Sequence, residues 1–153
     1  MRIELSSEAI GSTDMHAGIN VVPFDGDTHA AAARELLNAA YRNGGGEVLA
    51  LDQWWPNLIA DPEFDQELLF VLIDEHNSEM LAFAQVWNTG FIKDFAVRPS
   101  SQRKGIGRAL LNHIFHSLRE RGLHDCSLKV LADNPTNAPA FYRANGMEVI
   151  EPV

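Results

Sequence analysis

Apolar residues recur along this chain with two different spacings, and each spacing predicts one kind of secondary structure. A spacing of three to four residues places side chains on one face of a helix. This spacing predicts helices over 28–42, 51–60 and 138–145, and a longer helix from Ile106 to a stop at Gly122. Thr28 is expected to cap the first of these helices, because a hydroxyl can accept a hydrogen bond from an unpaired helical N–H.

Apolar runs bounded by turn residues predict the strands. These runs lie at 18–24, 67–75, 80–87, 91–97, 126–132 and 147–153. Short turns join the three strands between residues 67 and 97, which predicts an antiparallel meander. The segment 91–132 has the order strand, helix, strand, which predicts a parallel βαβ unit with a right-handed crossover. The predicted fold class is therefore α/β, with a central mixed sheet.

The length of 153 residues fits one domain spanning 1–153, with 46% hydrophobic and 22% charged residues. Residues 1–17 carry three acids and lack a long apolar core, so we expect a flexible extension rather than a signal peptide. No apolar stretch approaches the ~20 residues of a membrane span, so no membrane is expected as a partner. Cys126 is the only cysteine, which excludes an intrachain disulfide and fits a cytoplasmic location.

The charges are unevenly distributed along the chain. The net charge is −9, and 47–79 holds nine acids and no Lys or Arg, yet 98–121 holds six bases and one acid. A nucleic-acid-binding protein usually has a broad basic face, so nucleic acid is not an expected partner. The local basic cluster indicates either a compact anionic ligand or a basic helix surface that acids balance elsewhere.

Two glycines stand at the predicted boundary between a strand and the longest helix. The pattern is Gln102-x-x-Gly105-x-Gly107, with basic residues at Arg103, Lys104 and Arg108. A helix start presents unpaired N–H groups and a positive dipole end, and glycine lets the backbone approach an anion closely. A phosphate or pyrophosphate is therefore the expected ligand. The Gly-Lys-Ser/Thr ending of the P-loop is absent, and the dinucleotide fingerprint would need glycine where Leu110 stands.

The stretch "FAVRPSSQRKGIGRALLNHIF", followed by "PAFYRANGM", resembles the GNAT superfamily of acetyl-CoA-dependent N-acetyltransferases. In that family Gln/Arg-x-x-Gly-x-Gly/Ala follows a strand, and a later helix carries a Tyr four residues before a Gly. These residues are Tyr142 and Gly146 here. The resemblance is detailed over 68–147, and the element order extends it over 19–153. It implies a GNAT-like acyl-CoA N-acyltransferase fold with helices on both faces of the sheet, and acetyl-CoA as cosubstrate.

The resemblance also implies which residues bind the cofactor. Backbone amides of the glycine loop would hold the pyrophosphate, with Gln102 at the start of the loop. These amides belong to Arg103, Lys104, Gly105, Ile106, Gly107 and Arg108. The backbone of Phe95, Ala96 and Val97 would serve the pantetheine arm and the acetyl carbonyl, where one N–H donor is worth ~3–4 kcal/mol in acyl transfer. Relatives place an Asn about seven residues before the Tyr. Asn134 stands eight before it and Asn137 five, and either is a candidate for this contact.

Two side chains are candidates for the chemistry. Tyr142 would protonate the leaving thiolate, for which a neutral phenol is suited; the alternative is a half-buried helix aromatic. Asp94 lies beside Phe95 and would attract a cationic amine or accept its proton, directly or through water. The alternative for Asp94 is a structural carboxylate that pairs with Lys93.

The amine acceptor is less defined by the sequence. Trp54 and Trp55 fall where this architecture usually binds the acceptor, although core packing of at least one of them is expected. The acids of 47–79 fit a cationic acceptor such as a polyamine, an aminoglycoside or a lysine, and equally fit a solvated surface. His113 and His116 lack a third ligand, so no metal is expected.

Three hypotheses of function follow. The first is an N-acetyltransferase that acts on a primary amine of a small molecule or a protein. The second is a non-catalytic acyl-CoA-binding sensor or assembly module of the same fold, and the third is a nucleotide-binding module unrelated to coenzyme A. A homodimer through the last strands or the exposed helix faces is compatible with all three.

Overall fold

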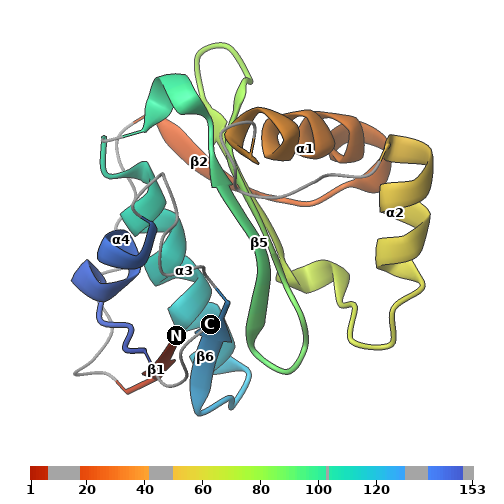
Figure 1. The fold of residues 1–153 in the computed structure, drawn as a ribbon. Coiled ribbons are helices and arrows are strands. Elements are labelled where there is room, and N and C mark those ends of the chain that lie inside the picture. Colours follow the sequence, from red (N-terminus) through yellow and green to blue (C-terminus); the bar gives the residue numbers. More distant parts are fainter. Residues whose placement is uncertain (7–17, 42–49, 103, 130–137, 150–153) are drawn as a thin grey trace.

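A six-stranded mixed sheet forms the centre of the molecule, and helices cover both of its faces (Figure 1). The computed structural model describes residues 1–6, 18–41, 50–102, 104–129 and 138–149. The strands are β1 (Arg2–Glu4), β2 (Ile19–Pro23), β3 (Leu69–Asp74), β4 (Met80–Val86), β5 (Phe91–Val97) and β6 (Asp125–Leu128). The helices are α1 (Gly26–Tyr41), α2 (Leu51–Ile59), α3 (Ile106–Glu120) and α4 (Ala138–Ala144), with short 3-10 turns at Gln66–Leu68 and Pro99–Ser101.

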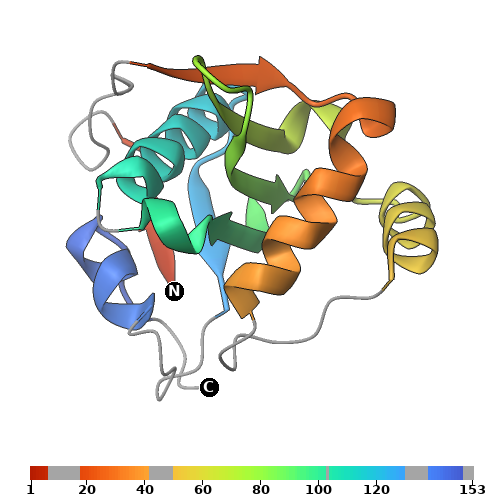
Figure 2. The ribbon, with the colours of Figure 1, turned by 90° about the horizontal axis from the view of Figure 1, so that it is seen from above.

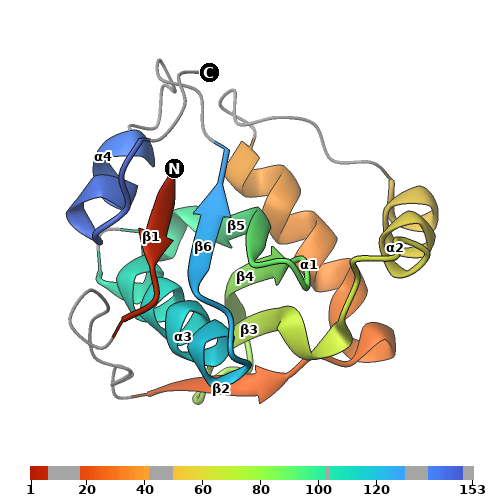
Figure 3. The ribbon, with the colours of Figure 1, turned by 90° about the horizontal axis from the view of Figure 1, so that it is seen from below.

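The strand order is β1-β6-β5-β4-β3-β2, as Figure 3 shows. All neighbouring strands are antiparallel except β5 and β6, which are parallel. This arrangement confirms the predicted meander of β3, β4 and β5 and the predicted parallel βαβ unit of β5, α3 and β6. In Figure 2, α3 and α4 lie on one side of the sheet and α1 and α2 on the other.

Two hydrophobic cores result, one on each face of the sheet. The α3 side buries Leu110, Leu111, Ile114 and Phe115 of α3 against the inner residues of β3, β4 and β5. The α1 side buries residues of α1 and α2 around Phe83 of β4. Alternation along β4 explains this division, because successive side chains of a strand point to opposite faces and every residue of β4 is buried.

The first helix begins earlier than the sequence predicts. The carboxylate of Asp25 accepts a hydrogen bond from the N–H of Asp27 at 3.1 Å, and the Thr28 hydroxyl donates to the same carboxylate at 3.1 Å. Asp25 therefore caps the helix, which starts at Gly26, and the prediction that Thr28 is the cap was wrong. An ionised carboxylate at this position also interacts favourably with the positive end of the helix dipole.

The start of the chain departs from the expected flexible extension. Arg2–Glu4 forms β1, which pairs antiparallel with β6, and Met1, Ile3 and Leu5 are buried. The apolar alternation of these three residues is a strand signal, and burial of their side chains offsets the entropy lost on ordering. For residues 1–6 the prediction was therefore wrong, and residues 7–17 lie outside the described residues.

Only residues 147–149 of the last predicted strand, 147–153, are described. In this part, Glu148 makes an isolated antiparallel bridge with Arg2, through N–H to C=O bonds of 2.9 Å in both directions. Residues 130–132 of the strand predicted over 126–132, and residues 150–153, lie outside the described residues. Among the described helices, none has the length and apolar content that crossing a bilayer requires.

We expect Ile3→Ala to lower the free energy of unfolding by about 2 kcal/mol, because Ile3 is 4% exposed and its truncation leaves a cavity. Arg2→Ala is the matched control. Its side chain is half-exposed and pairs with Asp125 at only 3.9 Å, so its loss is expected to cost less than about 0.5 kcal/mol. Urea unfolding of both variants checks this, and equal stability of Ile3→Ala and wild type would show that β1 adds nothing to the fold.

Candidate active site

The glycine loop connects β5 to α3, as the sequence predicts. After Val97 the chain makes the 3-10 turn Pro99–Ser101, and α3 begins at Ile106. The Gln102 side chain donates from Nε2 to the carbonyl of Val97 at 3.1 Å. Its side chain therefore holds the two ends of the turn together, which fits a residue that begins the loop.

The start of α3 has the features of an anion site. Gly105 is the N-cap residue in the left-handed conformation, with φ of 79°, and it offers no side-chain cap. The N–H of Ala109 bonds to the carbonyl of Gly105 at 3.1 Å, the first bond of the helix ladder. The N–H groups of Ile106, Gly107 and Arg108 precede that bond, so helix geometry gives them no intrahelical acceptor.

Cations lie around these donors. Lys104 and Arg108 are exposed beside the glycines, and the predicted Arg103 lies outside the described residues. Backbone donors at a positive helix end, flanked by cations, are the groups that bind a diphosphate. The residues present therefore fit the pyrophosphate of coenzyme A.

Gly107 has a packing role that the sequence does not show. A Cβ atom at this position would lie 3.2 Å from Cζ of Phe141 in α4 and 3.4 Å from Cγ2 of Val97 in β5. Such contacts are tighter than ordinary van der Waals distances. The missing side chain thus lets α3 pack closely against α4, the helix that carries Tyr142.

The strand β5 runs past its described pairing with β6 toward this loop. Among the described residues, the two strands pair at Phe91↔Ser127 and Ile92↔Leu128, and β5 continues to Val97, whereas residues 130–137 after β6 lie outside the described residues. On its other side β5 has a bulge: Gln85 pairs with Asp94 and Val86 with Ile92, so Lys93 is an extra residue in β5. A bulge bends and twists its strand locally.

The backbone of β5 beyond the bulge faces two directions. The N–H of Arg98 bonds to the carbonyl of Leu81 in β4 at 2.7 Å. Because residues of an antiparallel strand alternate in direction, Ala96 also faces β4, and Phe95 and Val97 face the β6 side. Of the three predicted residues, Phe95 and Val97 therefore direct their backbone groups away from β4, and the Val97 carbonyl accepts from Gln102. The backbone of Ala96 is committed to the sheet.

Tyr142 lies in α4, in the core on the α3 side of the sheet. Its ring is 9% exposed and packs edge-on to Phe95, with 6.0 Å between ring centroids, and to Phe141 at 5.2 Å. Burial raises the pKa of the Tyr142 phenol, and the nearby Cys126 thiol raises it further. The hydroxyl thus stays protonated at neutral pH and can act as a proton donor.

Asp94 lies on the opposite face of the sheet. Its carboxylate pairs with Lys93 Nζ at 3.6 Å, and its side chain is 13% exposed. The ion pair with Lys93 that the sequence offers as the alternative role is thus present. A role of Asp94 in binding or deprotonating an amine stays a prediction. Lys93 Nζ also lies 5.9 Å from the ring centre of Trp87. Tyr142 and Asp94 therefore lie on opposite faces of the sheet.

Comparison with known proteins identifies the family. A family model described as the acetyltransferase (GNAT) family matches residues 30–147, more than half of the 153 residues. The chain belongs to the GNAT family. The resemblance noted in the loop and in the Tyr142 helix is thereby confirmed, as is the mixed α/β fold class.

Among relatives of this GNAT chain, the ribosomal protein bS18-alanine N-acetyltransferase of Escherichia coli K12 is 35% identical over 96 residues. That alignment covers 61% of this chain and 63% of the relative, so the matched part spans less than two thirds of the curated protein. The crystal structure of the E. coli S18-alanine enzyme superposes with a TM-score of 0.66 at 27% identity, covering 84% of this chain and 76% of that one.

A second structural neighbour of the GNAT chain shares the fold more closely. A GCN5-related N-acetyltransferase from Sphaerobacter thermophilus superposes with a TM-score of 0.81 at 23% identity. The superposition covers 97% of this chain and 46% of the S. thermophilus protein. AAC(6')-Iy, solved with a CoA bisubstrate analogue, has a TM-score of 0.63 at 15% identity, over 88% of this chain and 94% of that one.

The two tryptophans predicted near the acceptor differ in burial. Trp54 is 5% exposed and packs edge-on against Phe83 at 6.0 Å, so it belongs to the core, as expected for one of the pair. Trp55 is half-buried and packs against Phe24 and Phe64 at 5.4 and 6.2 Å. A role of either ring in acceptor binding stays a prediction.

The remaining candidates are placed as follows. Asn134 and Asn137 lie outside the described residues. His113 packs edge-on against Phe70 at 5.6 Å, and burial lowers its pKa. Cys126 is fully buried, as expected for a small core residue.

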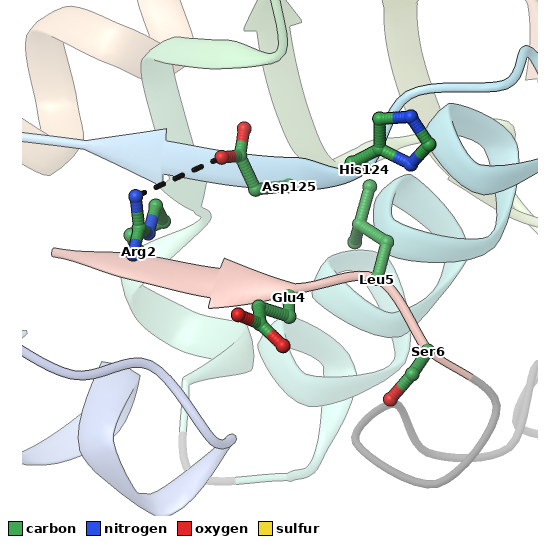
Figure 4. A pocket seen from close by; sticks show the side chains of 6 residues that line it. All are labelled: Arg2, Glu4, Leu5, Ser6, His124 and Asp125. Atoms are coloured by element: carbon green, nitrogen blue, oxygen red, sulfur yellow. Dashed lines mark ion pairs between the residues drawn. The ribbon is translucent and has the colours of Figure 1, made fainter.

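A pocket of about 320 Å³ lies elsewhere, on β1 and the start of β6 (Figure 4). Arg2, Glu4, Leu5, Ser6, His124 and Asp125 line it. It lies near the C-terminal end of α3, whereas the glycine loop lies at the N-terminal end. The 15 residues of α3 separate the two by about 22 Å at a rise of 1.5 Å per residue. This pocket is therefore separate from the candidate active site.

Gln85 is a residue that sequence reasoning missed. It is a polar residue in the apolar run MLAFAQVW, it is fully buried, and neither Nε2 nor Oε1 has a partner among the described residues. Leaving such a group unpaired typically costs about 1–3 kcal/mol, so a partner is expected. The one signal in the sequence is a glutamine inside an apolar strand run, which stands out because glutamine is seldom buried.

We expect the free energy of unfolding to fall as the pH rises above about 9. Burial raises the pKa of Cys126 from 9.0 and that of Tyr142 from 10.0, so the unfolded chain releases these protons first. Fewer protons on the unfolded state mean that stability decreases with pH, by at most about 1.4 kcal/mol per pH unit for each group. Urea unfolding between pH 8 and 10.5 measures the slope. Cys126→Ala should flatten its first part, and a flat wild-type profile would contradict the burial of both groups.

Proposed function

We propose that this chain transfers an acetyl group from acetyl-CoA to a primary amine of a small molecule or a protein, by direct attack of the amine. One observation carries the proposal: the unpaired N–H groups at the start of α3 follow the end of β5, with Tyr142 on one face of the sheet and Asp94 on the other. Acetyl-CoA would supply the activated thioester, which makes acyl transfer to an amine favourable.

Different residues bind the cofactor, stabilise the carbonyl oxygen and protonate the leaving sulfur. The backbone N–H groups at the start of α3 bind the pyrophosphate, with Lys104 and Arg108 adding positive charge. Phe95 and Val97 present backbone groups on the side of β5 that faces away from β4. A fixed N–H donor there stabilises negative charge developing on the carbonyl oxygen. Tyr142 donates its proton to the departing sulfur, and its buried position keeps the phenol neutral.

The acceptor enters from the Asp94 side. A carboxylate there attracts the ammonium form of an amine and accepts its proton, directly or through water, with Lys93 as its counter-charge in the resting state. The E. coli relative is named for the alanine of a ribosomal protein, which makes a peptide amino terminus the first acceptor to test. A cytoplasmic location and a homodimer stay predictions.

The test is release of free thiol from acetyl-CoA by the full chain, against a panel of peptides, amino acids, polyamines and aminoglycosides. The panel includes hexapeptides that begin with alanine. Amine-dependent thiol release with formation of the acetylated amine supports the proposal. Binding of coenzyme A without thiol release on any amine supports the non-catalytic sensor or assembly module instead. A larger thermal shift with ATP or NAD than with coenzyme A favours a nucleotide-binding module.

A further inference from the structure

The ammonium group of Lys93 lies between a carboxylate and an aromatic ring. Its Nζ is 3.6 Å from Oδ2 of Asp94 and 5.9 Å from the centre of the Trp87 ring. A carboxylate supplies the opposite charge, and the face of an indole attracts a cation through its quadrupole. These are the kinds of group with which a protein binds the protonated form of an amine.

A bulge in β5 brings these side chains to one face of the sheet. In a regular strand, neighbours such as Lys93 and Asp94 point to opposite faces. Asp94 stands opposite Gln85 and two residues from Ala96, which belongs to the core under α1 and α2. Trp87 packs against the same core, and Lys93, the extra residue of the bulge, reaches its ring. The fold thus holds one of its own ammonium groups on the face where Asp94 would meet the acceptor.

Acidic residues lie beside this end of β4. The N–H of Asn88, directly after Trp87, bonds to the carbonyl of Glu63 at 2.9 Å, and the carboxylate of Asp61 accepts from the N–H of Glu63 at 2.8 Å. The turn that carries Asp61 and Glu63 is therefore next to the ring. Negative charge around a site raises the local concentration of cations, so this face favours a cationic ligand from solvent.

The two members of the ion pair differ in exposure. The Lys93 side chain is 45% exposed and that of Asp94 only 13%. The ammonium can therefore move into solvent while the carboxylate stays in place. An exposed ion pair and an exposed cation–π contact are each weak, so an external ammonium group is able to replace Lys93.

We propose that Lys93 is a specificity-determining residue: its ammonium occupies the site formed by Trp87 and Asp94 in the free protein, and a cationic acceptor displaces it. The inference rests on the proposed acetyl transfer and adds a competitor built into its acceptor site. A cationic amine binds only by displacing Lys93, whereas an uncharged amine has no need of the ammonium site.

Lys93→Met tests this, because methionine keeps an apolar chain beside the ring and removes the charge. Calorimetry with 1,4-diaminobutane in the presence of coenzyme A, which carries no acetyl group, measures binding without turnover. We expect the dissociation constant of the diamine to fall at least about threefold, since the competing contacts are lost. With 4-methylaniline, which is uncharged at neutral pH, kcat/KM is expected to change less than about twofold, because no ion pair is exchanged.

Two further variants separate the position of the charge from its sign. Lys93→Arg keeps a cation beside the ring and is expected to restore the competition seen in wild type. Arg119→Met removes one positive charge from an exposed position at the far end of α3, so it changes the net charge equally and should leave diamine binding unchanged. Urea unfolding of each variant shows whether it is folded.

The dissociation constant of the diamine decides the proposal. The inference is overturned if Lys93→Met binds the diamine no more tightly than wild type does, if neither protein binds it, or if Arg119→Met shows the same gain. Tighter binding by Lys93→Met in a protein that releases no thiol with any amine would refute acetyl transfer and leave the ammonium site standing. Thiol release with an unchanged dissociation constant would leave acetyl transfer standing and reduce Lys93 to a surface ion pair.

Discussion

Gly105→Glu is expected to weaken acetyl-CoA binding at least about a hundredfold, or about 2.7 kcal/mol, as measured by calorimetry. The substitution places a carboxylate at the N-cap of α3, where the helix dipole and the unpaired N–H groups would otherwise face the pyrophosphate. Two like charges in direct contact repel each other, and the new side chain also blocks close approach of the ligand to the backbone.

Two controls separate the charge from the backbone strain. Gly105 has a φ of 79°, so any side chain there costs about 1–2 kcal/mol of strain. Gly105→Ala carries that strain without the charge and is expected to keep most of the affinity. Arg119→Glu introduces the same carboxylate on an exposed position at the other end of α3 and should leave binding unchanged. Unchanged affinity in Gly105→Glu would show that the pyrophosphate does not bind at this loop.

Much of the architecture could be predicted because its signals are local. The bounds of β5 and the start of α3 agree with prediction to the residue, since Phe91 follows a turn and Ile106 starts a regular apolar spacing. The parallel pairing of β5 and β6 follows from a single connection through a helix, which has few alternatives. In each case, neighbours in the sequence determine the outcome.

The parts that prediction missed depend on partners distant in the sequence. β1 is three residues long, and it is stable because β6, more than 120 residues later, pairs with it. The role of Gly107 depends on Phe141, which packs against it from α4. The position of Gln85 beside Asp94 requires the register between β4 and β5, including a bulge that shifts that register by one residue. No local pattern contains this information.

The same reasoning explains why the acceptor side was harder to predict than the cofactor side. Binding of a diphosphate needs backbone donors, which a glycine spacing reveals. Recognition of an amine depends on side chains from several strands, and Trp54 shows the consequence, because its aromatic signal belongs to the core around Phe83. Asp94 is predictable from its place beside Phe95, whereas its cross-strand neighbour Gln85 follows only from the register of β4 and β5.

Tyr142→Phe is expected to lower kcat about 10²–10³-fold and to leave the dissociation constant of acetyl-CoA unchanged. The substitution removes one proton donor and keeps the ring that packs on Phe95 and Phe141. Steady-state thiol release and calorimetry measure the two quantities.

The pH profile distinguishes a proton donor from a packing residue at position 142. Burial raises the pKa of the Tyr142 phenol, so wild-type kcat should not fall between pH 8 and 10 through its ionisation. In Tyr142→Phe the thiolate must depart without an acid, and this departure becomes the slow step. A thioester whose thiol has a lower pKa should therefore recover part of the rate that the variant loses. Equal kcat in the two proteins would assign Tyr142 to packing alone. The proton for the sulfur would then have to come from solvent.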